Sequence, residues 1–441
     1  MSADYGAFLA SKRRRVAETG RHVDPGEVHP SLFDWQNLIV RWAAHKGRAA
    51  VFADTGTGKT RIMIEWSRLV ADRALVVAPL VVCQQTVREA ARIGVGVRYV
   101  RDQSEAEGPG VWITNYERTD RFDFSTFPAV AIDESSRLKH RDSKTTIDLT
   151  EAVRDVPFRL ASTATPAPND VAELCTHAEW LGVMKRAEML ATYFVNDGKE
   201  WRLKGHAAGP MYRWMASWAV ALRRPSDIGY SDDGHELPTL SVRAAMVDVD
   251  LPAEDGALFA GGVGGVSGRA TVRKLTVAAR VERAVELVAA EPDEPWVVWC
   301  GLNPEADGVA GALAERGFKV VNVEGSQAPE EKASAMEAFM DGQVQVLVTK
   351  PKIAGFGMNF QHCARMSFVG LSDSFEAYYQ CIRRCLRYGQ DREVVAYVVL
   401  SDAESAIADN VARKEREAER MTAQLVAAMR DTWLYEEAVT A

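Results

Sequence analysis

Residues 53–60 read Ala53-Asp54-Thr55-Gly56-Thr57-Gly58-Lys59-Thr60 and directly follow the apolar run 49–52. A short buried strand that ends in a Gly-rich loop with Gly-Lys-Thr is typical of a phosphate-binding P-loop. The glycines allow backbone N–H groups to close around an anion, and the next helix directs its positive N-terminus at that anion. A Gly-rich turn without a ligand is the alternative, because Ala53 stands where the P-loop consensus has its first glycine.

The side chains of this loop predict a nucleotide and a metal ion. We expect Lys59 to reach the β- and γ-phosphates of ATP and the Thr60 hydroxyl to ligate Mg²⁺. The cofactors predicted from this segment are therefore ATP and Mg²⁺. The residues that we expect to contact the nucleotide here are Thr55, Gly56, Thr57, Gly58, Lys59 and Thr60.

Length and composition indicate an ordinary globular protein. The 441 residues are enough for about two to three domains. The chain is 47% hydrophobic and 26% charged, without an apolar run of membrane-spanning length and without a secretory pattern at its start. We therefore expect a cytoplasmic protein without membrane contact.

Cysteine spacing and net charge bear on whether the chain binds zinc, forms disulfides or contacts nucleic acid. The six cysteines contain no Cys-x-x-Cys pair, so free thiols are a better interpretation than zinc ligands or disulfides. The net charge of −8 argues against a broadly basic surface, but it is compatible with a local basic channel for nucleic acid. The cluster Lys12-Arg13-Arg14-Arg15 is interpreted either as a solvated tail or as such a contact.

The order of apolar runs predicts two α/β lobes. Short apolar runs alternate with amphipathic helical stretches in both halves of the chain, which indicates parallel sheets covered by helices. The predicted strands are 49–53, 74–78, 97–100, 111–114, 129–132, 159–162, 296–300, 320–323, 344–349, 366–369 and 394–400.

The Gly-rich stretch between the two sets of strands predicts a connector. We divide the chain into a polar segment 1–29, a first lobe 30–245 with a helical insertion at about 170–220, and a linker 246–270. A second lobe, 271–400, and a C-terminal helix within 401–441 complete the prediction.

A pair of carboxylates follows the apolar segment Val130-Ala131-Ile132. We expect Asp133 to hold Mg²⁺ opposite Thr60, and Glu134 to orient and deprotonate the attacking water. An Asp-Glu pair alone is more often a solvated strand end. The P-loop upstream of this pair favours the catalytic interpretation.

Two further segments carry chemistry. Ser162-Thr163-Ala164-Thr165-Pro166 is either a capped turn or a hydroxyl loop that hydrogen-bonds the acidic pair. Arg384 and Arg387 lie three residues apart, on one face of a predicted helix. Such a pair is either a solvated basic face or a source of charge that stabilises the transition state at a γ-phosphate.

In this order, the motifs resemble those of superfamily 2 helicases and translocases. Gln36 resembles the upstream glutamine that recognises adenine, and residues 163–166 match the third motif. Residues 77–80 and 113–117 resemble the first-lobe motifs that follow a nucleic-acid strand. Ala53 matches the helicase form of the P-loop.

Three details resemble the Swi/Snf-like branch of double-strand DNA translocases, which is related to the DEAD/DEAH-box proteins. They are Asp-Glu-Ser-Ser-Arg-Leu-Lys-His at 133–140, Ala-Gly-Phe-Gly-Met-Asn at 354–359, and the spacing of Gln380, Arg384, Arg387 and Gln390. The opening Leu-Phe-Asp-Trp-Gln at 32–36 and the compact size look most like phage-encoded members, which would place the protein in the host-cell cytoplasm.

The resemblance implies two RecA-like lobes, each a parallel sheet flanked by helices, with an ATP cleft between them. It implies hydrolysis by Lys59, Glu134, Arg384 and Arg387, with Gln36, Asp133 and Gly357 also at the nucleotide. It implies nucleic-acid contacts from Pro79, Asn115, Tyr116, Thr163, Thr349 and Gly355. Double-stranded DNA is the expected partner, with single-stranded DNA as a second option; no protein partner is predicted.

One motif position and one insertion are unusual. Ser136 stands where many relatives have histidine, so we expect a different coupling between the second and third motifs. The four tryptophans Trp180, Trp201, Trp214 and Trp218 indicate either helical core packing or an element that stacks on bases.

Three functions are compatible with these motifs. The first is a DNA-stimulated ATPase that moves along DNA or remodels it, and the second is an RNA helicase of the same superfamily. The third is a nucleotide-gated recruitment factor, for which hydrolysis only resets binding.

Overall fold

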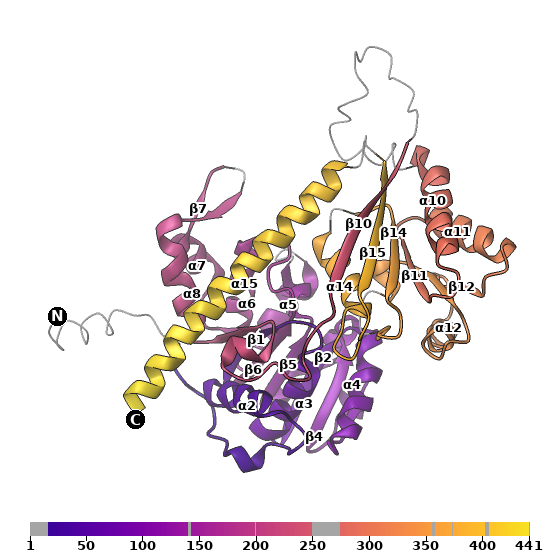
Figure 1. Ribbon diagram of the computed structural model, residues 1–441. Helices are drawn as coiled ribbons and strands as arrows, with labels where there is room; N and C mark the ends of the chain where they lie inside the picture. Colours follow the sequence, from indigo (N-terminus) through magenta and orange to yellow (C-terminus); the bar gives the residue numbers. More distant parts are fainter. Residues whose placement is uncertain are drawn as a thin grey trace. The chain divides into compact units, whose positions relative to one another are not determined.

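The computed structural model in Figure 1 describes residues 16–139, 143–198, 200–248, 274–354, 358–372, 374–401 and 405–440. Several predicted features fall outside these ranges: the basic cluster 12–15, His140, nearly all of the Gly-rich linker, and the site candidates Gly355 and Gly357. Two compact units make up the chain, one ending at Asp233 but including the residues from Glu417 onward, and the other formed by Gly234–Arg416.

The first unit is built on a parallel sheet whose strands are buried along most of their length. Apolar side chains on both faces of such strands require covering layers on both sides. In the order in which they pair, the strands are β3 (Val97–Tyr99), β4 (Gly110–Asn115), β2 (Arg73–Ala78), β5 (Ala129–Asp133), β6 (Phe158–Thr163), β1 (Arg48–Ala53) and β9 (Ala219–Leu222).

Helices and short 3₁₀ turns connect and cover these strands (Figure 1). The helices are α2 (Asp34–Lys46), α3 (Lys59–Val70), α4 (Leu80–Arg92), α5 (Lys144–Ala152), α6 (Leu174–Leu181), α7 (Arg186–Tyr193) and α8 (Ala208–Met215). The 3₁₀ turns are η1 (Pro25–Glu27), η2 (Gln103–Glu105), η3 (Tyr116–Arg121), η4 (Phe124–Thr126), η5 (Ser135–Lys139), η6 (Val171–Glu173), η7 (Gly205–Ala207) and η8 (Pro225–Ile228).

The register of the sheet brings the motif-bearing loops to one edge. Phe52 of β1 pairs with Thr163 of β6, and Asp133 of β5 pairs with Ser162 of β6. Ala78 at the end of β2 pairs with Asn115 at the end of β4. Because the strands are parallel, the loops that follow them all leave the sheet at its carboxyl edge.

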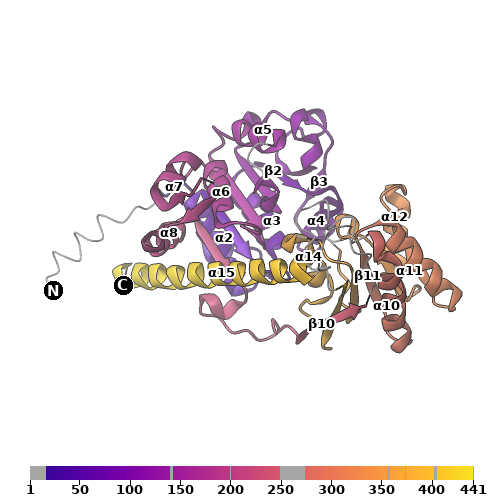
Figure 2. The ribbon, with the colours of Figure 1, turned by 90° about the horizontal axis from the view of Figure 1, so that it is seen from above.

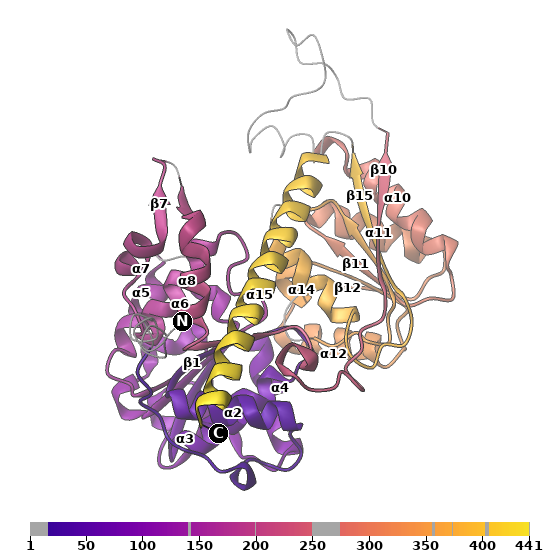
Figure 3. The same ribbon diagram turned by 60° about the vertical axis from the view of Figure 1, so that its left-hand side comes forward.

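The insertion predicted at about 170–220 contains helices and also a small antiparallel hairpin, β7 (Phe194–Asn196) and β8 (Trp201–Leu203). This hairpin extends beyond α7 and α8 (Figure 3). Trp180, Trp214 and Trp218 are buried in the core of the first unit, which confirms the packing interpretation for these three residues. Trp201 is partly buried against the same core.

The second unit has its own parallel sheet. Its strands are, in the order in which they pair, β10 (Leu240–Val247), β15 (Val394–Ser401), β14 (Arg365–Val369), β11 (Trp296–Cys300), β13 (Val346–Thr349) and β12 (Val320–Asn322). Its helices are α10 (Val277–Ala290), α11 (Asn303–Glu315), α12 (Pro329–Met340), α13 (Pro351–Ala354) and α14 (Phe375–Cys385). Figure 2 shows α10 and α11 packed side by side. The predicted fold class, with parallel sheets flanked by helices in two lobes, is confirmed.

The observed unit boundaries differ from the predicted ones at two places. Residues 234–245, which we had assigned to the first lobe, belong to the second unit because β10 is hydrogen-bonded in parallel to β15. Helix α15 (Ser405–Thr440) does not form a separate C-terminal element. Its side chains Met421, Leu425 and Met429 are buried in the core of the first unit, beside which its C-terminal part runs (Figure 3).

Within the described ranges, none of the helices combines the length and the apolar character that crossing a bilayer requires.

A buried ion pair joins three elements of the second unit. Arg280 of α10 and Glu305 of α11 are fully buried, with 2.8 Å between Nη1 and Oε1. Arg280 also donates to the Val369 carbonyl at the end of β14, at 3.2 Å. Glu305 accepts the backbone N–H groups of Gly301 and Leu302 at 2.8 and 2.9 Å. The pair therefore holds the loop that follows β11.

We expect Glu305→Ala to lower the free energy of unfolding by about 3–5 kcal/mol, because it removes a buried partner of the Arg280 charge and the acceptor of two backbone N–H groups. The matched control is Glu286→Ala, which removes a half-exposed partner of Arg283 and is expected to cost less than about 1 kcal/mol. Urea denaturation of the two variants checks this difference. Equal losses in the two variants would contradict the role given to the buried pair.

Candidate functional site

The P-loop has the backbone geometry that its sequence predicts. It connects the end of β1 to the first residue of α3, Lys59, and both of its glycines have positive φ, 88° at Gly56 and 77° at Gly58. A Cβ atom at Gly58 would lie 2.4 Å from Nε2 of Gln36. Glycine is therefore required at this position both by its backbone conformation and by the neighbouring side chain.

Lys59 is folded over its own loop. Its Nζ donates to the carbonyls of Ala53 and Asp54 at 2.8 and 3.1 Å. The Thr57 hydroxyl also donates to the Asp54 carbonyl, at 2.6 Å. These bonds hold the ammonium group at the N-terminus of α3, where the helix dipole and backbone N–H groups favour an anion.

Gln36 joins α2 to the P-loop. Its side chain is buried, its Oε1 accepts the backbone N–H of Phe33 at 3.1 Å, and its Nε2 donates to the Thr57 carbonyl at 3.0 Å. In this structure, the side-chain amide thus positions the loop directly. Recognition of adenine by Gln36 stays a prediction.

Asp133 is the buried carboxylate at the end of β5. Burial raises its pKa, while the Lys59 ammonium and the backbone N–H of Glu134, 3.0 Å from Oδ1, lower it. A buried carboxylate next to the P-loop lysine suits Mg²⁺, which prefers oxygen ligands and keeps several waters. Asp133 and Thr60 would hold this ion, and its positive charge would stabilise the ionised form of Asp133.

Glu134 is held in an unusual backbone conformation. Among the described residues, Glu134 is the non-glycine residue whose φ is positive, at 53°. The Thr163 hydroxyl donates to Glu134 Oε2 at 3.3 Å and accepts the backbone N–H of Thr165 at 3.2 Å. A non-glycine residue stays in this region only when its surroundings hold it there, and such residues are concentrated at functional sites.

A histidine that the sequence did not indicate contacts the residue that follows Glu134. His177 of α6 is fully buried, and its Nε2 lies 3.0 Å from the Ser135 hydroxyl. Its ring meets that of Phe52, the residue before Ala53, edge to face at 5.3 Å. Burial lowers the pKa of His177 to about 4, so the imidazole is neutral at pH 7. His177 thus connects the strand before the P-loop to the acidic turn.

The residues predicted to contact nucleic acid are mostly buried. Pro79, Asn115, Tyr116 and Thr163 all lie at the carboxyl edge of the first sheet, and each has little exposed surface. In the second unit Thr349 is fully buried, and its hydroxyl donates to the Val323 carbonyl at 3.2 Å. Contacts from these side chains to nucleic acid stay a prediction.

In the second unit the two predicted catalytic arginines share one acceptor. Nη1 of Arg384 and Nη1 of Arg387 lie 3.0 and 3.1 Å from the Met358 carbonyl. Arg384 is buried and also donates to the side chain and the carbonyl of Gln380, at 2.7 and 2.9 Å. Arg387 is only partly buried and follows the end of α14. The two guanidinium groups are thus close together, but Arg384 is held far more firmly.

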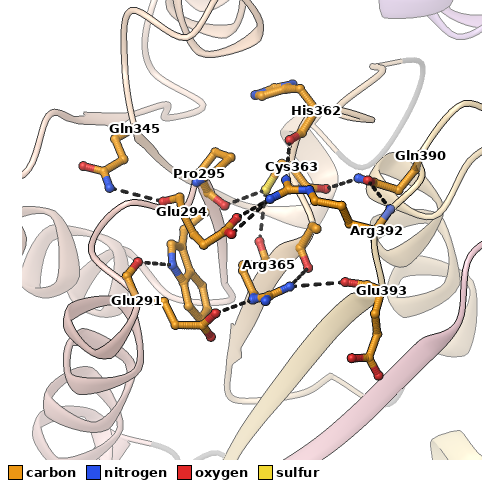
Figure 4. Close-up of polar contacts among 12 residues, drawn as sticks. Glu291, Glu294, Pro295, Gln345, His362, Cys363, Arg365, Gln390, Arg392 and Glu393 are labelled. Atoms are coloured by element: carbon orange, nitrogen blue, oxygen red, sulfur yellow. Dashed lines mark hydrogen bonds and ion pairs between the residues drawn. The ribbon is translucent and has the colours of Figure 1, made fainter.

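The residues just beyond these arginines hold the loop before β14 (Figure 4). Nε2 of Gln390 donates to the carbonyls of Gln361 and Cys363 at 2.6 and 3.2 Å. Arg392 binds both carboxylate oxygens of Glu294, at 3.0 and 2.7 Å. Figure 4 shows these contacts as one network at the start of the strands. They connect the segment after α14 to the loop that contains Met358.

Comparisons with known proteins find one known domain, and it lies within the second unit. Residues 279–389 match the model of the helicase conserved C-terminal domain. The chain is 23% identical over 125 residues to DEAD-box ATP-dependent RNA helicase 21 of Oryza sativa subsp. japonica. It is 24% identical over 139 residues to the pre-mRNA-splicing ATP-dependent RNA helicase prp28 of Neosartorya fischeri and to that of Aspergillus fumigatus.

Each of these alignments covers 28% of this chain and 17% of the relative, so the match spans only a small part of each relative. Residues 279–389 are thus similar to the helicase conserved C-terminal domain, and the aligned segments are similar to parts of ATP-dependent RNA helicases.

The neutral His177 predicts a pH dependence of stability. The unfolded chain protonates this imidazole below about pH 6.5, whereas the folded chain does so only near its lowered pKa of about 4. Stability is therefore fully present above about pH 6.5 and falls by about 3 kcal/mol as the pH drops toward 4.

We expect the melting temperature of His177→Gln to change less than that of the wild type between pH 6.5 and pH 4. His22→Gln, which replaces an exposed histidine, serves as the control and is expected to follow the wild type. Parallel pH profiles for the wild type and His177→Gln would show that His177 does not titrate in this range.

Proposed function

We propose that this protein is an ATP-dependent helicase or translocase that uses ATP hydrolysis to move along nucleic acid or to remodel it. One observation carries the proposal: Lys59, the Asp133–Glu134 turn and Thr163 lie at one sheet edge, where the Thr163 hydroxyl is bonded to Glu134 and the Lys59 ammonium lowers the pKa of Asp133. A lysine that binds phosphate, a carboxylate for the metal ion and a carboxylate for water are the groups that hydrolysis of ATP requires.

In this proposal Mg²⁺ supplies charge that stabilises the leaving phosphate and the transition state. Lys59 binds the β- and γ-phosphates, and the loop between Asp54 and Lys59 surrounds them with backbone N–H groups. Glu134 orients the attacking water and accepts its proton, while Thr163 holds the carboxylate. Arg387 and Arg384 supply the positive charge that neutralises the charge developing on the γ-phosphate.

Double-stranded DNA is the proposed substrate because the motifs at 133–140, 354–359 and 380–390 resemble the Swi/Snf-like branch. The opening at 32–36 and the compact size are most similar to phage-encoded members of that branch. RNA is the second candidate, because the relatives with matching segments are named RNA helicases. A nucleotide-gated recruitment factor is the third. These alternatives differ in which polymer stimulates ATPase activity and in whether hydrolysis is needed at all.

The substrate is identified by measuring ATPase activity with duplex DNA, single-stranded DNA, single-stranded RNA and duplex RNA. Triplex displacement and duplex unwinding on the best polymer follow. We expect the greatest stimulation by duplex DNA, with displacement of the triplex. Stimulation by RNA alone would support the RNA helicase, and an ATPase insensitive to every polymer would overturn the proposed function.

We expect Glu134→Gln to lower kcat by about 10²–10⁴-fold with little change in ATP affinity, because it removes the general base and keeps the shape of the side chain. The control is Glu151→Gln, which changes an exposed carboxylate of α5. Steady-state ATPase kinetics and nucleotide binding check both variants. Normal turnover in Glu134→Gln would exclude the proposed mechanism, and full biological activity despite lost turnover would favour the recruitment factor.

The two arginines are expected to differ. Arg387→Ala should lower kcat by about 10³-fold without affecting ATP binding or folding, which is the scale of an arginine finger. Arg384→Ala should lower kcat and also the melting temperature, because Arg384 is buried and holds Gln380 and Met358. Arg316→Ala, an exposed change on the same unit, is the control. ATPase assays and thermal melts separate the two effects; normal turnover of Arg387→Ala would exclude its catalytic role.

A further inference from the structure

Tyr116 makes a direct bond from the β4 loop to the acidic turn. It is the first residue of η3, directly after β4, and its side chain is buried. Its hydroxyl donates to the Asp133 carbonyl at 2.7 Å. Because β2 lies between β4 and β5 in the sheet, this bond passes over the end of β2. It therefore joins two loops that are not neighbours in the sheet.

The hydroxyl is suited to act as a permanent donor. Burial raises the pKa of Tyr116 well above its ordinary value, and the Asp133 carboxylate adds to this effect, whereas Arg137 opposes it. The carbonyl that the hydroxyl binds belongs to the residue directly before Glu134, whose backbone has the φ of 53°. Fixing this peptide group limits how the Glu134 carboxylate is directed.

Arg137 provides a second connection between the same loops. Its guanidinium lies over the Tyr116 ring, 5.0 Å from the centroid, and 3.4 Å from Oε1 of Glu117. Its backbone N–H donates to the Glu134 carbonyl at 3.0 Å. A cation over an aromatic face is attracted to the ring, so Arg137 and Tyr116 stabilise each other's position.

The outer end of this connection is open to solvent. The side chains of Arg137 and Glu117 are 40% and 60% exposed. Nδ2 of Asn115 donates to Oε2 of Glu117 at 2.7 Å. An exposed ion pair contributes little to stability, and a phosphate group competes effectively with a carboxylate for arginine. A polyanion at this surface would therefore draw Arg137 from Glu117 at low cost.

We propose that Tyr116 is a positioning residue that couples nucleic-acid binding at the β4 loop to ATP hydrolysis at the Asp133–Glu134 turn. This inference rests on the proposed function. Phosphates that bind Arg137 shift its guanidinium on the Tyr116 ring, and the Tyr116 hydroxyl transmits the shift to the Asp133 carbonyl. In this role Tyr116 acts through Asp133 and Glu134, and not through the direct contact with nucleic acid that the resemblance implies for it.

The test uses the full chain and Tyr116→Phe, which removes only the hydroxyl. ATPase kinetics are measured without polymer and with duplex DNA, single-stranded DNA or single-stranded RNA oligonucleotides. We expect the ratio of stimulated to basal kcat to fall by about 3- to 10-fold, the scale of one hydrogen bond. Affinity for the oligonucleotide, measured by fluorescence anisotropy, should stay within about twofold of the wild type.

Two further variants distinguish coupling from a merely structural role. Tyr212→Phe removes the hydroxyl of another buried tyrosine of the first unit, on α8, and should leave the ratio unchanged. Arg137→Gln changes an exposed side chain and should also lower the ratio, even if Tyr116→Phe fails to fold. In the double variant the free-energy loss calculated from the ratio should be smaller than the sum of the losses in the two single variants, because both residues act on one connection.

Each result has a defined consequence. A normal ratio in Tyr116→Phe, or in Arg137→Gln if Tyr116→Phe does not fold, overturns the coupling and leaves the proposed function intact. A lower affinity for the oligonucleotide with an unchanged ratio makes Tyr116 a binding residue and also overturns the inference. A wild-type ATPase that none of the oligonucleotides stimulates overturns the proposed function and the coupling together.

Discussion

The left-handed turn at Glu134 is the constraint on which the candidate site depends. Its φ of 53° is unfavourable for a side chain with a Cβ, so it persists only because its neighbours hold it. Tyr116 binds the carbonyl before it, Thr163 binds its carboxylate, and His177 binds the serine after it. These three residues come from different elements, so the conformation of the turn depends on how several elements at the carboxyl edge are placed.

Parallel register makes this arrangement possible. The ends of β1, β5 and β6 are aligned by the pairing of Phe52 with Thr163 and of Asp133 with Ser162. The P-loop and the acidic turn therefore emerge side by side, without a long loop between them. The same geometry brings the β4 loop within reach, so the proposed surface for a polymer lies one hydrogen bond from the proposed hydrolytic groups. This closeness explains how one small unit would combine hydrolysis with response to a ligand.

In the second unit, polar contacts hold the loops at the ends of the sheet. Its buried pair Arg280–Glu305 and the contacts of Gln390 and Arg392 fix loops at the two ends of the sheet. Arg384 belongs to this internal framework, whereas Arg387, at the end of the same helix, is only partly buried. The two arginines, three residues apart, thus differ in how far they are buried. A catalytic role requires a guanidinium group that is positioned but still able to change partners.

The sequence by itself determined strands β1–β6 and β11–β15, the fold class and the P-loop, because each depends on a local pattern of apolar residues, glycines and charges, whereas β7–β10 were not predicted. Only the tertiary structure decided that His177 supports Ser135, 42 residues away, and that Tyr116 binds Asp133, 17 residues away. It also decided that β10 pairs with β15 and that the end of α15 packs into the first unit. Residues far apart in the chain meet only when the sheet orders its strands. No local pattern in one sequence specifies such a meeting, so candidate catalytic groups could be named from the sequence and the residues that position them could not.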